Sequence, residues 1–249
     1  MIGLCSVTFR EESVEEVVRL AQQANLDLIE WGSDGHVPQT DKKQAEKVAR
    51  LMKEAGLRSK SYGTYYRLGS GEDFTDYMEV AKILGASTLR VWAGEKGSAE
   101  ATSEERVQVI EDAKRLGELA AVEGMTIALE YHSKTLTDTP DSAVQLMEEI
   151  EMENVLLYWQ PAEVLTVQER IESLPQLTPW ITNVHVFNWE NYLNRFPLVE
   201  AADAWKQYIE LTEKHSPHEV NYFLEFVPGD DPIEGFFESA DTLKNWLQA

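Results

Sequence analysis

The chain has 249 residues, 43% of them hydrophobic, and is therefore long enough to bury a large core. Its 44 acidic and 22 basic residues give a formal net charge of -22, which opposes binding to nucleic acid or to an anionic membrane surface. The single cysteine, Cys5, excludes an intramolecular disulfide and a thiolate-rich zinc site.

Short apolar runs alternate along the chain with amphipathic stretches of about ten to twenty residues, which are typical of helices. Eight of the runs are rich in β-branched and aromatic residues and are predicted to be strands. In chain order, these predicted strands cover residues 2–7, 26–31, 57–61, 88–92, 126–131, 155–159, 182–187 and 221–226.

The predicted helices carry their own start and stop signals. Three of them begin with the spacing of a capping box, in which a glutamate follows three residues later: these starts are Ser13, Thr102 and Thr166. Three junctions between a helix and the next strand contain a glycine, which favours a left-handed cap: these are Gly56, Gly85 and Gly124. The recurring junction indicates one repeated unit.

Eight strands, each followed by a helix, predict a (β/α)₈ TIM barrel, a fold of roughly 250 residues. The rival is a doubly wound open sheet, which normally has a glycine-rich phosphate turn after its first strand. Residues 8–12 contain no glycine. Because no linker or low-complexity segment divides the sequence, we predict one TIM barrel domain over residues 1–249.

The active site of such a barrel lies at the C-terminal ends of its strands. Glu130, His185 and Glu225 each follow or interrupt an apolar run there, and a desolvated carboxylate needs a partner or a metal. With the amide oxygen of Gln160 they form a mixed oxygen and nitrogen donor set. This set suits Mn²⁺ first, and also Mg²⁺, Co²⁺ or Zn²⁺. The alternative is that these residues are ion-paired and only close the barrel mouth.

Two further charged residues are predicted on strands of the first half of the chain. Glu30 falls on the second strand and Arg90 on the fourth. Alternate strands contribute to the same interior layer of a TIM barrel. We therefore predict a buried Glu30–Arg90 ion pair close to the metal, the alternative being two outward-facing side chains.

Several strand-end sequences resemble those of a known superfamily over nearly the whole chain. They are Ile29-Glu30-Trp31-Gly32 with His36-Val37-Pro38, Ser61-Tyr62-Gly63, Leu129-Glu130-Tyr131-His132, Tyr158-Trp159-Gln160-Pro161, His185-Val186 and Leu224-Glu225-Phe226. Their order and placement are similar to those of the sugar isomerase/epimerase superfamily with a xylose isomerase-like TIM barrel. That superfamily also includes inosose dehydratase and endonuclease IV relatives.

The resemblance implies a divalent metal held by Glu, Asp, His and Glu from strands 5 to 8. The matching positions are Glu130, Gln160, His185 and Glu225, and the two glutamates are also implied to be the catalytic acid/base pair. Gln160 departs from the usual Asp and removes one negative charge. Glu163 stands where the superfamily has a histidine that contacts the substrate.

Polar and aromatic side chains near the predicted strand ends complete the candidate site. Arginine recognises carboxylate or phosphate with two parallel hydrogen bonds, and aromatic faces pack against the C–H surfaces of sugars. The candidate substrate-binding residues are His36, Tyr62, Arg67, His132, Glu163, Trp189 and Arg195.

The leading hypothesis is a metal-dependent sugar isomerase or epimerase. One glutamate removes the proton from the carbon next to a ketose carbonyl, and the other returns a proton. The alternatives are a lyase of the inosose dehydratase type and a non-catalytic sugar-binding relative with a weakened metal site. An endonuclease-like function ranks last, because five histidines are too few for a metal cluster and the net charge opposes DNA.

The expected partner is a small-molecule sugar or polyol, with no nucleic acid and no membrane. The resemblance also implies a homo-oligomer, a dimer or a tetramer. Residues 1–10 lack the charged and apolar regions of a signal peptide, and no run of about 18 apolar residues predicts a transmembrane helix. A reducing cytoplasm is the expected location.

Overall fold

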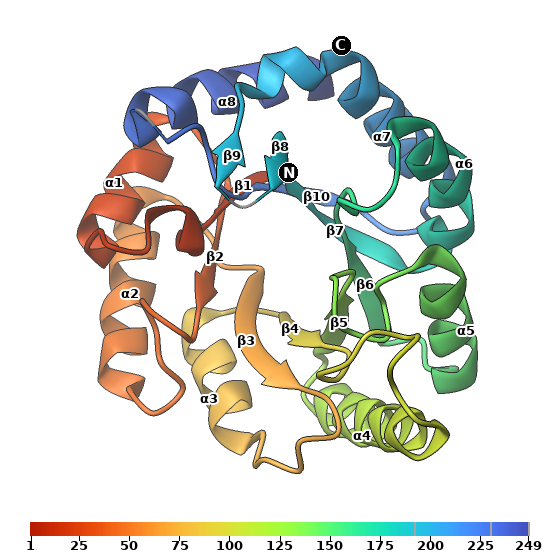
Figure 1. Cartoon of the computed structure of the whole chain (residues 1–249). Coiled ribbons are helices and arrows are strands. Elements are labelled where there is room, and N and C mark those ends of the chain that lie inside the picture. The colour runs from red at the N-terminus through yellow and green to blue at the C-terminus, as the bar shows by residue number, and fades with distance from the viewer. Residues whose placement is uncertain (192, 230, 249) are drawn as a thin grey trace.

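Eight parallel strands close into a barrel in the computed structural model, which describes residues 1–191, 193–229 and 231–248 (Figure 1). The strands are β1 (Ile2–Cys5), β2 (Leu28–Gly32), β3 (Ser61–Arg67), β4 (Thr88–Trp92), β5 (Thr126–Glu130), β6 (Val155–Trp159), β7 (Ile181–Val186) and β10 (Asn221–Leu224). Each strand pairs with its sequence neighbour in the barrel, and β1 pairs with β10 to close the ring. The predicted TIM barrel is confirmed.

Within the described ranges, eight helices form a ring outside the strands (Figure 1). They are α1 (Val14–Gln23), α2 (Lys42–Ala55), α3 (Thr75–Leu84), α4 (Ser103–Val122), α5 (Pro140–Ile150), α6 (Val167–Leu177), α7 (Ala202–His215) and α8 (Pro232–Leu247). Thr102 and Thr166 make complete capping boxes, whereas Ser13 only accepts a hydrogen bond from the Glu16 amide. Gly56 and Gly85 adopt the predicted left-handed cap.

The buried apolar residues form two clusters, one between the helices and the barrel and one inside the barrel. The larger cluster packs the helices against the outer face of the strands. The smaller one consists of Cys5, Val7, Leu28, Ala128, Tyr158 and Phe223. Because side chains alternate along a strand, the interior residue that follows Leu28 on β2 is Glu30, and the one that follows Ala128 on β5 is Glu130. Apolar packing inside the barrel thus gives way to charged residues toward the C-terminal rim.

The third strand is displaced from its predicted position. Residues 57–61 were predicted, but β3 covers Ser61–Arg67, and Arg58 makes only an isolated bridge to Leu28. The true strand lacks an apolar run because it borders charged side chains: a Cβ atom at Gly63 would lie 2.5 Å from Nη2 of Arg90. The predicted range 57–61 places Tyr62 just after the strand, and this is wrong, because Tyr62 is the second residue of β3.

A short antiparallel hairpin, β8 (Trp189–Asn191) and β9 (Asn194–Arg195), was not predicted from the sequence. Figure 1 shows it inside the ring of helices, toward α8. Three 3-10 helices, Ser6–Phe9, Thr178–Trp180 and Leu198–Ala201, complete the described elements. None of the described helices combines the length and the apolar character that crossing a bilayer requires.

Candidate metal centre

Four buried polar side chains come from four strands that are neighbours in the barrel. Glu130 ends β5, Gln160 follows β6, His185 lies in β7 and Glu225 follows β10. These strands are adjacent in the order β5-β6-β7-β10, so their C-terminal ends share one arc of the rim. The side chains of all four residues are buried.

Nδ1 of His185 lies at the centre of this group. It is 3.0 Å from Oε1 of Gln160, 3.4 Å from Oε2 of Glu225 and 3.6 Å from Oε1 of Glu130. Three acceptor oxygens repel the lone pair of a neutral ring nitrogen unless a proton or a cation lies between them. Carboxylate, amide and imidazole donors in this arrangement fit a divalent cation.

The charge of the site also fits such an ion. Glu30, Glu130 and Glu225 contribute three buried negative charges, and Arg90 contributes one positive charge. With His185 neutral, the group carries a net charge of -2 from these four residues. A buried charge is costly unless it is compensated, and one divalent cation would balance this group.

The ionisable groups of the site titrate away from their ordinary ranges. Burial, with the nearby carboxylate of Glu130, raises the pKa of Glu225. Burial also opposes ionisation of Glu130, but the Arg90 guanidinium, together with His185 and His132, outweighs burial and lowers the pKa of Glu130. Burial disfavours charge on His185, yet Glu225 and the neighbouring carboxylates raise its pKa. The two glutamates of the donor set are thus pushed in opposite directions.

Arg90 and Trp92 hold Glu130 from the neighbouring strand β4. The guanidinium of Arg90 donates from Nε to Oε1 of Glu30 at 2.9 Å and from Nη1 to Oε2 of Glu130. The predicted buried Glu30–Arg90 ion pair is therefore confirmed. Nε1 of Trp92 donates to the same oxygen of Glu130 at 2.5 Å. Oε2 of Glu130 is thus occupied, while Oε1 faces His185.

Sequence reasoning missed the hydrogen bond from Trp92 to Glu130. The signal lay in the strand register, because Trp92 on β4 pairs directly with Glu130 on β5. Trp92 also organises the mouth of the barrel: His132 stacks on its ring with centroids 4.7 Å apart, and the Arg67 guanidinium lies 4.0 Å from its centroid. Two of the predicted substrate-binding residues therefore pack against the tryptophan that donates to Glu130.

A small cavity of about 70 Å³ adjoins Gln160. Its lining includes His132, Glu163 and Trp189, three of the predicted substrate-binding residues, together with Asp138. The β8–β9 hairpin therefore borders the candidate centre through Trp189 at its first residue.

The remaining predicted substrate-binding residues lie elsewhere. Arg195 lies 4.4 Å from the centroid of the Phe226 ring and lines a different cavity, which it shares with Arg10. His36 is buried and its Nε2 is 3.0 Å from the carbonyl oxygen of Glu12. Tyr62 is fully buried and its hydroxyl donates to the carbonyl oxygen of Val37 at 2.6 Å.

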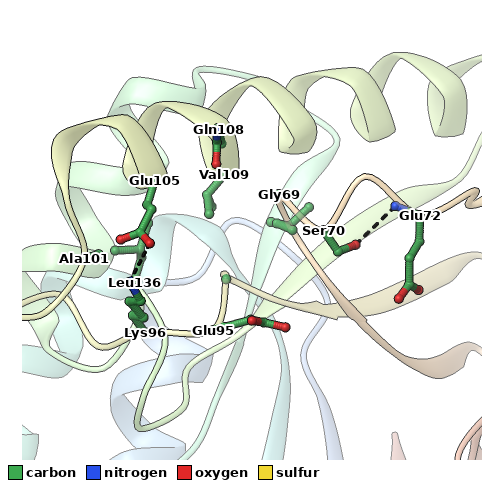
Figure 2. Close-up of a pocket in the computed structure, with 12 residues that line it drawn as sticks. Gly69, Ser70, Glu72, Glu95, Lys96, Ala101, Glu105, Gln108, Val109 and Leu136 are labelled. Atoms are coloured by element: carbon green, nitrogen blue, oxygen red, sulfur yellow. Dashed lines mark hydrogen bonds and ion pairs between the residues drawn. The ribbon is translucent and has the colours of Figure 1, made fainter.

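A larger cavity of about 410 Å³ lies outside this group, between the loops after β3 and β4 and the start of α4 (Figure 2). Its charged lining includes Glu72, Glu95, Lys96 and Glu105, of which Lys96 donates to Glu105 at 2.5 Å. None of the predicted site residues lines this cavity.

Comparison with known proteins places these features in a wider context. A family model described as a xylose isomerase-like TIM barrel matches residues 18–196. A 3-dehydroshikimate dehydratase of Bacillus anthracis is 27% identical over 203 residues, which cover 75% of this chain and 71% of that protein.

Solved structures show the same fold. The probable 3-DHS dehydratase AsbF of Bacillus anthracis, involved in petrobactin synthesis, superposes with a TM-score of 0.79 at 22% identity, covering 98% of each chain. A xylose isomerase-like TIM barrel protein of Mycobacterium smegmatis, in complex with magnesium, gives 0.77 at 16% identity, covering 99% of this chain and 95% of its own. A D-allulose 3-epimerase of Methylomonas sp. gives 0.76 at 15% identity, covering 98% and 97%.

Proposed function

Because the chain belongs to the xylose isomerase-like TIM barrel family, we propose that it is a divalent-metal-dependent sugar isomerase or epimerase. The reaction is a proton transfer at the carbon next to a ketose carbonyl. The observation that carries this proposal is the convergence of three oxygens, from Gln160, Glu225 and Glu130, on Nδ1 of His185.

Glu130, Gln160, His185 and Glu225 would hold the ion, with Mn²⁺ as the first candidate. A divalent ion there supplies Lewis-acid polarisation of a substrate carbonyl, which acidifies the neighbouring C–H bond. The contacts of the side chains themselves support distinct roles for the two glutamates.

Glu130 is the proposed base. Its Oε2 is held by Arg90 and Trp92, which favours the ionised form and aims Oε1 into the site. Glu225 is the proposed acid, because it is the other carboxyl group of the donor set, with Oε2 3.4 Å from Nδ1 of His185. Two carboxyl groups at one site can divide proton removal and proton return between them. Returning the proton to the opposite face of the same carbon is epimerisation, and returning it to the neighbouring carbon is isomerisation.

Dehydration is the second candidate reaction, favoured by the 27% identity to a 3-dehydroshikimate dehydratase. It begins with the same proton removal by Glu130. Glu225 then protonates a departing hydroxyl group, which leaves as water. The two reactions therefore use the same residues and differ in where the second proton goes.

The proposed substrate is an uncharged sugar or polyol. Glu163 and Asp138 line the cavity beside Gln160, and its described lining contains no arginine or lysine. An anionic group would therefore meet two carboxylates there. His132 and Ser133 offer hydrogen bonds to hydroxyl groups, and Trp189 offers an aromatic face. Cytoplasmic location and a dimeric or tetrameric state stay predictions.

Metal content and solvent exchange test this proposal. Protein purified without chelator should contain about one divalent ion per chain, and it should incorporate solvent deuterium into at least one neutral ketose. Glu130→Gln and Glu225→Gln should each slow this exchange by about 10² to 10⁴-fold, because each removes a proton-transfer group. Glu118→Gln, an exposed change on α4, is the matched control and should exchange at the wild-type rate.

The outcomes separate the candidate functions. Absence of bound metal would contradict both enzymatic proposals. Metal and sugar binding without exchange or loss of water would instead support the non-catalytic alternative. Formation of a dehydrated product would favour the lyase over the isomerase.

A further inference from the structure

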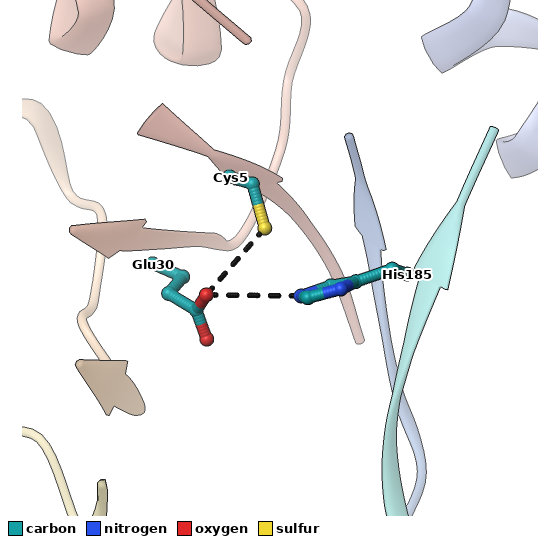
Figure 3. Close-up of side chains that lie close together, drawn as sticks. All are labelled: Cys5, Glu30 and His185. Atoms are coloured by element: carbon teal, nitrogen blue, oxygen red, sulfur yellow. Dashed lines mark hydrogen bonds and ion pairs between the residues drawn. The ribbon is translucent and has the colours of Figure 1, made fainter. Parts of the chain in front are cut away.

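Figure 3 shows Cys5 and Glu30 at one end of the His185 ring. Glu30 lies nearest to Nε2 of that ring, whereas the oxygens of the proposed metal ligands lie nearest to Nδ1. Its Oε1 accepts a hydrogen bond from Nε of Arg90 at 2.9 Å and lies 3.6 Å from Sγ of Cys5. Its Oε2 accepts hydrogen bonds from Oγ of Ser61 at 2.7 Å and from the hydroxyl of Tyr158. Glu30 is therefore a buried acceptor whose two oxygens are both occupied by donors.

Cys5, Glu30 and His185 lie close enough to share a cation, but their surroundings oppose it. The donors already bound to Glu30 leave it little capacity for a metal, and one of them, Arg90, is itself a cation. Burial, together with the charge of Glu30, raises the pKa of Cys5 well above its usual range, so its sulfur stays protonated. Glu30 is therefore available for another role.

The role follows from the two nitrogens of His185. Nδ1 faces the oxygens of Gln160 and Glu225, whereas Nε2 is buried without a hydrogen-bond partner and lies 3.7 Å from Oε1 of Glu30. A proton on Nε2 points at a negative charge and leaves the Nδ1 lone pair for a metal. The opposite tautomer would set the Nε2 lone pair against a carboxylate.

We propose that Glu30 is a positioning residue, which keeps the proton of His185 on Nε2 and thereby presents Nδ1 to the metal. This inference rests on the proposed function, since it assumes that Nδ1 is a ligand. Metal-bound histidines commonly donate their second ring N–H to a carboxylate, which fixes the tautomer.

The packing around His185 supports this role. The ring of Tyr158 lies 4.8 Å from the imidazole, centroid to centroid, and its hydroxyl donates to Glu30. Tyr158 thus holds the imidazole and its carboxylate partner together. Arg90 connects the same carboxylate to Glu130 on the other side. Glu30 therefore fixes His185 directly and Glu130 through Arg90.

Metal affinity in matched variants tests the proposal. Glu30→Gln removes the charge while keeping the shape, and should weaken Mn²⁺ binding by about 10 to 100-fold in calorimetric titration. Glu30→Asp restores the charge and should recover part of that loss. Glu118→Gln removes an exposed charge on α4 in the same kind of substitution and is the control. Wild-type affinity in Glu30→Gln, or an equal loss in Glu118→Gln, would overturn the proposal.

The tautomer can also be read without any variant of Glu30, which matters if Glu30→Gln does not fold. In zinc-loaded protein labelled with ¹⁵N-histidine, long-range proton–nitrogen spectra should show His185 protonated at Nε2 and not at Nδ1. The opposite tautomer would refute the positioning role even if metal binds. A wild-type protein that binds no divalent ion would instead refute the proposed function itself.

Discussion

The β1–β4 half of the barrel and the half made of β5, β6, β7 and β10 each bury glutamates, but the groups that contact these glutamates differ. In the β1–β4 half, Glu30 accepts hydrogen bonds from Arg90 and Ser61, and also from Tyr158. In the other half, Oε2 of Glu225 lies 3.4 Å from Nδ1 of His185. The side chains of both glutamates are buried, yet their pKa values shift in opposite directions.

Hydrogen-bond donors, rather than burial, explain this difference. Burial opposes the charge of Glu30, but the Arg90 guanidinium and several donors lower its pKa far below the ordinary value. Burial raises the pKa of Glu225, and the nearby charge of Glu130 adds to the effect. A carboxylate satisfied by donors supports the structure, while one short of donors can take up a proton or a metal. The first half thus acts as a support for the second.

The largest expected effect tests whether the first half is a structural support. Arg90→Gln leaves Glu30 and Glu130 buried without their cation, and removing one partner of a buried ion pair costs about 3–5 kcal/mol. Urea unfolding in the presence of chelator measures this loss without a contribution from metal. Arg19→Gln breaks an exposed pair with Glu16 and should change the midpoint little. Equal urea midpoints for the two variants would mean that the buried ion pairs of Arg90 do not stabilise the fold.

A smaller effect is expected from crowding the same ion pair. A Cβ atom at residue 63 would lie 2.5 Å from Nη2 of Arg90 and 3.2 Å from Oε1 of Glu30. Gly63→Ala should therefore destabilise the fold by about 1–3 kcal/mol, the usual cost of overpacking. The control is Gly35→Ala, where the nearest atom would be 4.0 Å away. If Gly63→Ala unfolds at the same urea concentration as this control, the ion pair tolerates displacement.

The smallest expected effect is on the metal affinity of the second half of the barrel. Gln160→Asp adds a negative charge to the donor set and should tighten Mn²⁺ binding by about tenfold, because ligand charge tunes cation affinity. Gln160→Asn has the length of aspartate without its charge and is the control. Calorimetric titration of both variants separates charge from geometry. Similar affinities would mean that the charge at this position does not limit binding.

The fold was largely predictable because its signals are local. Repeated apolar runs, caps and glycine junctions are properties of neighbouring residues, and they predicted all eight helix–strand repeats. Strand β3 was misplaced because its sequence is shaped by a distant side chain, that of Arg90, which needs space at Gly63. The β8–β9 hairpin was missed because two such short strands leave no periodic pattern.

The candidate site was also predictable only in part. Strand order alone led us to expect Glu130, Gln160, His185 and Glu225 at one rim, and the structure places them together there. The contacts of Trp92 with Glu130 and of Tyr158 with Glu30 depend on register and rotamer, which no spacing rule contains. The proposed metal donors were thus easier to predict than the residues that hold them in place.

Closure of the ring between β1 and β10 has a consequence for how the chain folds as it is made. Leu4 of β1 pairs with Leu224 of β10. During synthesis, β1 can therefore pair with β2 early, but it cannot pair with β10 until residues 221–224 have been made. Until then a nascent chain on the ribosome carries open strand edges, which can associate wrongly. Long-range pairing of this kind also slows folding. His185 and Glu225 consequently come together only after β10 has been made and has paired with β7.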